Sequence, residues 1–344
     1  MPKSKSRREF FGTLGEAGMA GALGQLSALG AIGLSTYARP EGRSVDTYPA
    51  RPIRLLCPFA AAGGVDITAR AIAQHLAVLW NQPVVVENRP GANGTIAVEA
   101  AVRAAPDGYT LTMISSSHSV NVTLQKKQPY DLIRDLAPIT QATSQPYVLV
   151  VNPELPVRSI EELVDYARAN PGKLTYGSSG LGGLSHLAGA LFGSLARIDL
   201  THIPYKGGAL AMSDVISGQI DMLFSTFLQS HGHIASGRLR PLAVTTVKRS
   251  TSLPELPTMQ EGGVRDYEVA GWYGVVASAA TPAPIIEKLN HAIVRILQQP
   301  DVHARLAVDG SEPVGSSPQD FDAFIRAEVV KWRTLIQQLG IRSE

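Results

Sequence analysis

Short runs of β-branched or apolar residues alternate with longer segments of helical periodicity through most of this chain. After the apolar run at 53–57, Ile72, Leu76 and Leu79 recur at the spacing of one helix face. Because neighbouring parallel strands must be joined by crossover segments, the alternation predicts βα units and mainly parallel sheets. The predicted strands are 53–57, 84–87, 110–114, 148–151, 174–176, 220–224, 242–245 and 269–277.

Two helix starts carry capping residues. Ser159 stands three residues before Glu162 as in a capping box, and Ser317 directly precedes Pro318. The second start opens a segment whose large apolar residues recur at helical spacing, and we interpret the aromatic ones as core and not as a cofactor site. The apolar residues are Phe321, Ile325, Trp332, Ile336 and Leu339.

The length of 344 residues exceeds one ordinary α/β domain and suffices for two lobes, each with its own core. A content of 44% hydrophobic and 17% charged residues is typical of a globular protein. The single cysteine, Cys57, cannot form an internal disulfide, and its position in an apolar run indicates a buried small side chain.

Residues 1–38 have the layout of an export signal. A basic start leads into a run of glycine, alanine and leucine without lysine or arginine. Within the start, Arg7 and Arg8 followed by Phe10 resemble the twin-arginine signal, and small residues around Ala38 predict cleavage there. We therefore expect a periplasmic protein; an uncleaved membrane anchor, disfavoured by Glu16, is the alternative.

Without residues 1–38, the basic and acidic residues of the chain balance. Residues 1–38 hold four of the 31 basic and two of the 29 acidic residues, so the rest of the chain is formally neutral. No cluster of lysine or arginine stands out in the sequence. Nucleic acid and anionic membrane surfaces require such a concentrated basic face, so neither is expected as a partner.

Four loops that follow predicted strands are rich in glycine, serine and threonine, namely 58–66, 115–121, 177–185 and 204–208. In open α/β sheets, ligands bind beyond the carboxyl ends of the strands, where helix N-termini point. An anion placed there gains hydrogen bonds from backbone N–H groups and the favourable end of helix dipoles. Each loop alone would be an ordinary turn, but the four together predict an anion-binding site.

The constellations that mark common enzymes are incomplete. The segment 177–181 approaches a nucleophile elbow but ends in Leu181 instead of glycine, and a partial dinucleotide fingerprint has Ser185 at its third glycine. His231 and His233 stand two apart on a predicted helix, where they point in different directions. His186, at a helix start, is interpreted as structural. We therefore expect no enzyme, no cofactor and no metal site.

The chain resembles the substrate-binding receptors of tripartite tricarboxylate transporters, the Bug family, from about Tyr48 to Ile341. The resemblance is carried by ordered short motifs: YP at 48–49, PF at 58–59, GGVD at 63–66, VVENRPGA at 85–92, APDGYTL at 105–111, PGKLTY at 171–176, SHLA at 185–188, PYKG at 204–207 and LPELPT at 253–258.

This resemblance implies a type II periplasmic binding fold, with two α/β lobes, mainly parallel sheets and a ligand cleft between them. Residues 39–142 and 271–344 would form lobe 1 and residues 143–270 lobe 2, with crossings near 141–147 and Gly271. The receptor, expected as a monomer, would close on a small organic anion and deliver it to membrane transporter subunits. The implied ligand-binding residues are Phe59, Ala60, Gly63, Gly64, Asp66, Ser116, Ser117, Ser178, Ser179, Ser185, His186, Tyr205, Ser225 and Thr226.

The sequence departs from the family pattern at two places. Ala62 and Val65 replace a glycine and a threonine of the first loop, and Ser225 and Thr226 stand where many relatives carry an Asp-Asn pair. Two neutral hydroxyls suit an ammonium group poorly, which predicts a preference for simple organic acids over their α-amino analogues.

Two other functions remain open at this stage. One is a hydrolase or isomerase on the same fold that uses the serines near His186. The other is a ligand sensor that docks on a membrane kinase, which would share the same cleft.

Overall fold

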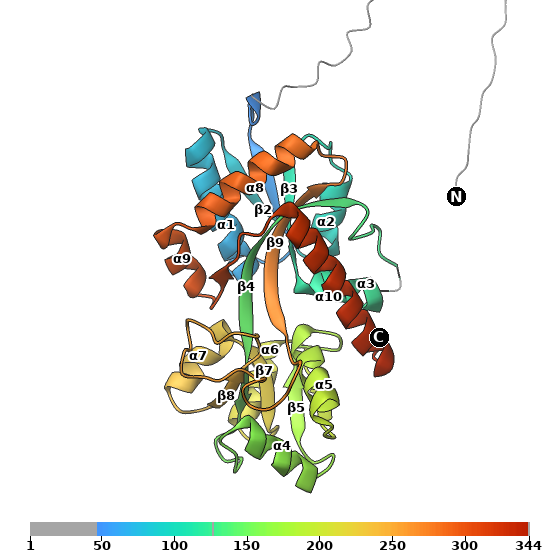
Figure 1. The fold of residues 1–344 in the computed structure, drawn as a ribbon, viewed down its shortest axis with the longest axis vertical. Coiled ribbons are helices and arrows are strands. Elements are labelled where there is room, and N and C mark those ends of the chain that lie inside the picture. The colour runs from blue at the N-terminus through green and yellow to red at the C-terminus, as the bar shows by residue number, and fades with distance from the viewer. Residues whose placement is uncertain (1–46, 126, 343–344) are drawn as a thin grey trace, which may run out of the picture. The chain divides into compact units, whose positions relative to one another are not determined.

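Strand β4 (Leu136–Val151) belongs to two sheets in the computed structural model, which describes residues 47–125 and 127–342 (Figure 1). Residues 136–146 of β4 pair with β9 (Ala270–Ser278). Residues 147–151 pair with β7 (Met222–Thr226) on one side and with β8 (Arg240–Val244) on the other. The long strand therefore passes from one sheet into the next, and the two sheets form the centres of two α/β lobes.

The first sheet has the order β2-β1-β3-β9-β4-β10 and the second β6-β5-β7-β4-β8. In the first, β1, β2, β3 and β4 run in one direction, and in the second β5, β6, β7 and β8 do. The antiparallel pairings all involve β4 or β9. The remaining strands are β1 (Ile53–Cys57), β2 (Val84–Asn88), β3 (Thr110–Ser115), β5 (Thr175–Ser178), β6 (Thr201–Pro204) and β10 (Glu312–Pro313).

All eight predicted strands are present, but the prediction was wrong for β4, which begins at Leu136 instead of 148. Its first part carries Pro138 and Pro146 among polar residues, so it shows neither an apolar run nor a clean alternation. Two register shifts in its pairing with β9 interrupt the pleat further. The short strands β6 and β10 were not predicted.

The helices follow the strands as βα units require. They are α1 (Gly64–Trp80), α2 (Thr95–Val102), α3 (Ser116–Leu124), α4 (Ile160–Ala169), α5 (Leu184–Ala196), α6 (Gly208–Ile216), α7 (Phe227–Ala235), α8 (Ala283–Leu297), α9 (Pro300–Ala307) and α10 (Pro318–Gln338), with a 3₁₀ turn at Ala92–Gly94. The predicted caps are confirmed, because Ser159 and Ser317 accept the amides of Glu162 and Asp320 at 3.1 and 3.0 Å. Glu162 does not complete a capping box; its carboxylate accepts the amide of Arg158 instead.

Helix α10 contributes to the cores of both lobes. Its first turns pack Phe321 and Ile325 against Trp272 of β9. Its later turns place Trp332 in a cluster with residues of β5, α4 and α5. Figure 1 shows α10 passing beside α3, with which it is in contact. The chain after β9 therefore packs against both sheets.

The expected export signal at 1–38 lies outside the described residues. Within residues 47–125 and 127–342, no helix is both long enough and apolar enough to cross a bilayer. The described chain from residue 47 onward belongs to one unit of contacting elements, which spans 43–344.

Candidate ligand-binding site

The loop that follows β1 and the start of α3 lie against each other. The ring of Phe59 meets the ring of His118 nearly at a right angle, with centroids 6.0 Å apart. His118 Nδ1 accepts the amide of Ser115 at 3.0 Å and so fixes the first turn of α3. Complete burial lowers the pKa of His118 to about 4, so its ring is neutral at pH 7.

Asp66 is committed to holding the first loop in shape. Its Oδ2 accepts the amide of Ala62 at 3.0 Å and Arg70 Nε at 2.8 Å, and its Oδ1 accepts Asn88 Nδ2 at 2.8 Å. Burial alone would raise the pKa of Asp66, but the hydrogen bonds from Arg70, Ala62 and Asn88 outweigh burial and lower it. The carboxylate is therefore ionised and already supplied with donors from the protein.

The serines at the start of α3 differ in whether their hydroxyl groups already form hydrogen bonds within the protein. Ser115 Oγ lies 2.7 Å from Ser117 Oγ, and Ser119 Oγ donates to the carbonyl of Ser116 at 2.7 Å. The hydroxyl of Ser116 itself, although the residue is largely buried, has no hydrogen-bond partner among the described residues. Ser116 is thus the donor that this helix start leaves available.

In the second lobe, the predicted serines bind one another across the loop between β5 and α5. Ser185 Oγ accepts the amide of Ser179 at 3.0 Å and lies 3.1 Å from Ser179 Oγ. Ser178 Oγ lies 2.7 Å from His202 Nε2. These bonds shape the loop around the N-terminus of α5 before any ligand is present.

His186 and His202 stack face to face beneath this loop, with ring centroids 3.9 Å apart and planes 8° from parallel. Burial, and for His186 also the neighbouring ring, lowers the pKa of both to about 4. His186 Nδ1 accepts the amide of Gly182 at 3.0 Å, which makes it a loop-fixing residue. Sequence analysis missed His202 because it lies on β6, where the β5 register sets it beside Tyr176.

Of the other predicted residues of this lobe, two already form side-chain hydrogen bonds within the described part of the protein and one does not. The hydroxyl of Tyr205 donates to Asp214 at 2.6 Å, and burial followed by this carboxylate raises the pKa of Tyr205 to about 12. Ser225 Oγ donates to the carbonyl of Thr226 at 3.2 Å. Thr226 precedes α7 without capping it through its side chain, which leaves its hydroxyl available.

Elements of the two lobes are in contact at two points. Leu124 at the end of α3 packs so closely on Gly182 that a Cβ there would overlap it. Phe227, the first residue of α7, lies against Gly310, where an added Cβ would come within 2.6 Å of the Phe227 Cβ. Elements of lobe 1 and lobe 2 are therefore in contact at the C-terminal end of α3 and at the start of α7.

One acidic residue at this junction was not predicted. Asp309, 6% exposed, follows α9 and accepts Ser311 Oγ at 2.9 Å and the hydroxyl of Tyr273 at 3.4 Å. Burial raises the pKa of Asp309, and within the described ranges no arginine, lysine or histidine forms an ion pair with it. It lies far along the chain from the four loops and in no recognisable motif, so the sequence carried no signal for it.

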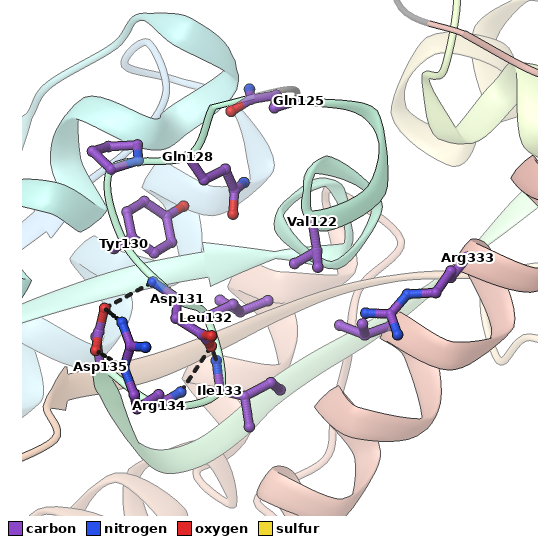
Figure 2. Close-up of a pocket in the computed structure, with 12 residues that line it drawn as sticks. Val122, Gln125, Gln128, Tyr130, Asp131, Leu132, Ile133, Arg134, Asp135 and Arg333 are labelled. Atoms are coloured by element: carbon purple, nitrogen blue, oxygen red, sulfur yellow. Dashed lines mark hydrogen bonds and ion pairs between the residues drawn. The ribbon is translucent and has the colours of Figure 1, made fainter.

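A separate cavity of about 490 Å³ lies between residues 122–135 and α10 (Figure 2). The carboxylates that line it already have partners within the protein. Asp131 accepts the amides of Ile133 and Arg134, and Asp135 forms an ion pair with the Arg134 side chain. None of the predicted site residues lines it. In the described part of the chain, no group of three or more histidine, cysteine, aspartate or glutamate side chains could hold a metal ion.

Residues 68–341 match the family model of the tripartite tricarboxylate transporter family receptor. The chain belongs to this receptor family. It is 36% identical over 301 residues to protein BugT of Bordetella pertussis, a match that covers 87% of this chain and 92% of BugT.

Solved members of the receptor family share the fold. Rpa4515 of R. palustris, solved with adipate, is 35% identical with a TM-score of 0.73 over 86% of this chain and 99% of its own. MatC of Rhodopseudomonas palustris, solved with bound malate, is 29% identical with a TM-score of 0.69 over 84% and 100%. The expected two-lobed periplasmic binding fold of the receptor family is thereby confirmed.

Proposed function

We propose that this chain is a periplasmic receptor that captures a small organic anion, a carboxylate, by closure of its two lobes and delivers it to a tripartite tricarboxylate type transporter. The observation that carries the proposal is the junction of two lobes joined by β4 and β9, where α3 contacts α5 and the start of α7 contacts Gly310. Helix N-termini stabilise an anion through backbone N–H groups and the helix dipole.

The lobes we propose are 39–142 with 271–344, and 143–270, although the later turns of α10 pack on the second lobe. The exchange of β4 between the two sheets near residues 146–147 places the proposed pivot of closure between the lobes. The hydroxyls of Ser116 in lobe 1 and Thr226 in lobe 2 are the donors that we propose for the ligand carboxylate.

We propose that the chain is not an enzyme. The closest approach to a nucleophile and base is Ser178 with His202, but the serine is fully buried. Among the residues that the structure places, no carboxylate hydrogen-bonds to His202 to orient it. Binding without turnover is the function that this geometry favours.

Localisation follows from the N-terminal segment. We propose that residues 1–38 act as a twin-arginine signal cleaved near Ala38 and that the mature receptor is a periplasmic monomer. A pull-down from membranes would distinguish a transporter from a sensor kinase as the partner. Solved relatives include a protein described as periplasmic binding protein BugD, 33% identical with a TM-score of 0.70.

Calorimetric titration of the purified protein with a panel of mono- and dicarboxylates tests the function. We expect at least one to bind, and Ser116→Ala to weaken that binding by about 1–3 kcal/mol, because the anion loses a buried donor. Ser213→Ala, at an exposed position on α6, is the matched control and should leave the affinity unchanged. If no carboxylate binds, or if both variants behave alike, the proposal fails.

A further inference from the structure

Asp309 lies where elements of both lobes meet. A Cβ on Gly64, the first residue of α1, would overlap Asp309 Oδ2 and the Tyr273 hydroxyl, so all three groups are in direct contact. The next residue, Gly310, lies against Phe227 at the start of α7. Tyr147 on β4 is close enough that Asp309, after burial, contributes to raising its pKa to about 12. The carboxyl group is therefore part of the junction described above.

The carboxyl group of Asp309 has unused acceptor capacity. Its Oδ2 accepts Ser311 and Tyr273, whereas no described residue donates to Oδ1, and that atom is not sealed off within the protein. A buried carboxylate with no cation beside it is unfavourable unless hydrogen-bond donors compensate it. This oxygen therefore has the chemistry to receive a donor that the ligand brings.

The position of Asp309 also disfavours a ligand anion at the start of α1. A carboxylate beside the first residue of α1 takes up the favourable end of that helix dipole and repels a second negative charge. In the described chain, the first turns of α3 and α5 contain no aspartate or glutamate. A ligand carboxylate is consequently expected at α3 and α5, with its remaining atoms toward Asp309.

We propose that Asp309 determines the specificity of the receptor by accepting a hydrogen bond from a hydroxyl or ammonium group carried by the bound carboxylic acid. The ligand class is then a hydroxy or amino acid, a deepening that rests on the proposed function. The absence of an acid after β7 predicted the opposite preference, but that expectation considered only residues 225–226. Asp309 supplies the acid from a different part of the fold.

Calorimetric titration of the full protein with succinate, malate and aspartate tests the inference without any variant, since the three share one carbon skeleton. We expect malate or aspartate to bind at least tenfold more tightly than succinate. Asp309→Asn should reduce that preference at least tenfold and should not weaken the binding of succinate, because the substitution removes a negative charge. Asp199→Asn, which removes the same charge at an exposed position, is the matched control and should retain the preference.

Equal or tighter binding of succinate by the wild-type protein overturns the role of Asp309 and leaves the receptor function in place. The same conclusion follows if Asp309→Asn keeps the wild-type preference. If none of a broad panel of carboxylates binds, the receptor function and this inference are both wrong. Thermal unfolding of each variant without ligand identifies any that does not fold, in which case the wild-type comparison decides alone.

Discussion

Gly64 shows how a single residue shapes the junction, because only the absence of its side chain lets α1 begin against Asp309 and Tyr273. We expect Gly64→Ala to lower the free energy of unfolding by about 1–3 kcal/mol, since the two side chains or the backbone must shift to admit a methyl group. Urea denaturation monitored by tryptophan fluorescence measures the change.

The matched control is Gly232, which lies inside α7 and has no atom within 4 Å of an added Cβ. Gly232→Ala should raise the free energy of unfolding by about 0.5–1 kcal/mol, because alanine loses less backbone entropy in a helix than glycine. The same change in sign or size at both glycines would contradict the close packing proposed at Gly64.

Two buried histidines and one half-buried histidine predict how stability depends on pH. Burial lowers the pKa of His118, His186 and His202 from 6.5 to about 4, so the folded chain resists protonation while the unfolded chain accepts it. Stability is therefore fully present above about pH 6.5 and falls as the pH drops toward 4. Asp309, whose pKa is raised, acts in the opposite direction at the acidic end.

Urea denaturation at pH 7.5, 5.5 and 4.5 checks this dependence. His118→Gln should lose stability at pH 7.5 but show a smaller further loss between pH 6.5 and 4.5 than the wild type, because one of the three groups no longer titrates. A stability that is flat across this interval would mean that the histidines are protonated without penalty in the folded protein.

At the scale of elements, Glu328 joins α10 to β9. Its Oε2 accepts Trp272 Nε1 at 3.1 Å and Trp332 Nε1 at 2.9 Å, and the side chain is buried. Glu328→Ala should cost about 2 kcal/mol or more, since two buried indole N–H groups lose their acceptor. Glu328→Gln retains one oxygen for both and should cost less. Chemical denaturation ranks the two variants, and an equal cost would assign the effect to the lost carboxylate charge, which pairs with Lys331, instead of the indole hydrogen bonds.

The elements that sequence patterns predicted well are those that are stabilised by residues close to them in the sequence. Strand β1 is an apolar run before a helix with a clear stripe, and Ser159 and Ser317 cap their own next turns. The first part of β4 is polar and bulged, and its strand conformation comes from pairing with β9, far along the chain. No local pattern could reveal it.

The candidate site divides in the same way. The glycine- and serine-rich loops were visible because each precedes a helix, and a shared site among them stays a prediction. No sequence signal indicated His202 or Asp309. His202 contacts Ser178 only because of the register of β5 and β6. Asp309 contacts Gly64 only after α9 has packed on α1. Long-range packing determines which polar groups face each other.

At the scale of the whole described chain, the two lobes are held by more than β4 and β9. One apolar cluster combines Val120 and Leu124 of α3, Leu187 of α5 and Trp332 of α10. The lobe closure that we propose would therefore occur while these side chains stay in contact or slide past one another. A shear along this cluster, with the strands as the pivot, fits the packing better than a free hinge.

The place of α10 in the chain has a consequence for how the protein is made. This helix follows every strand of both sheets in the sequence, yet it covers Trp272 in one lobe and packs among residues of the other. During synthesis, the strands of both lobes therefore leave the ribosome before the helix that covers them. Until α10 docks, the apolar surface that it covers on both lobes remains exposed.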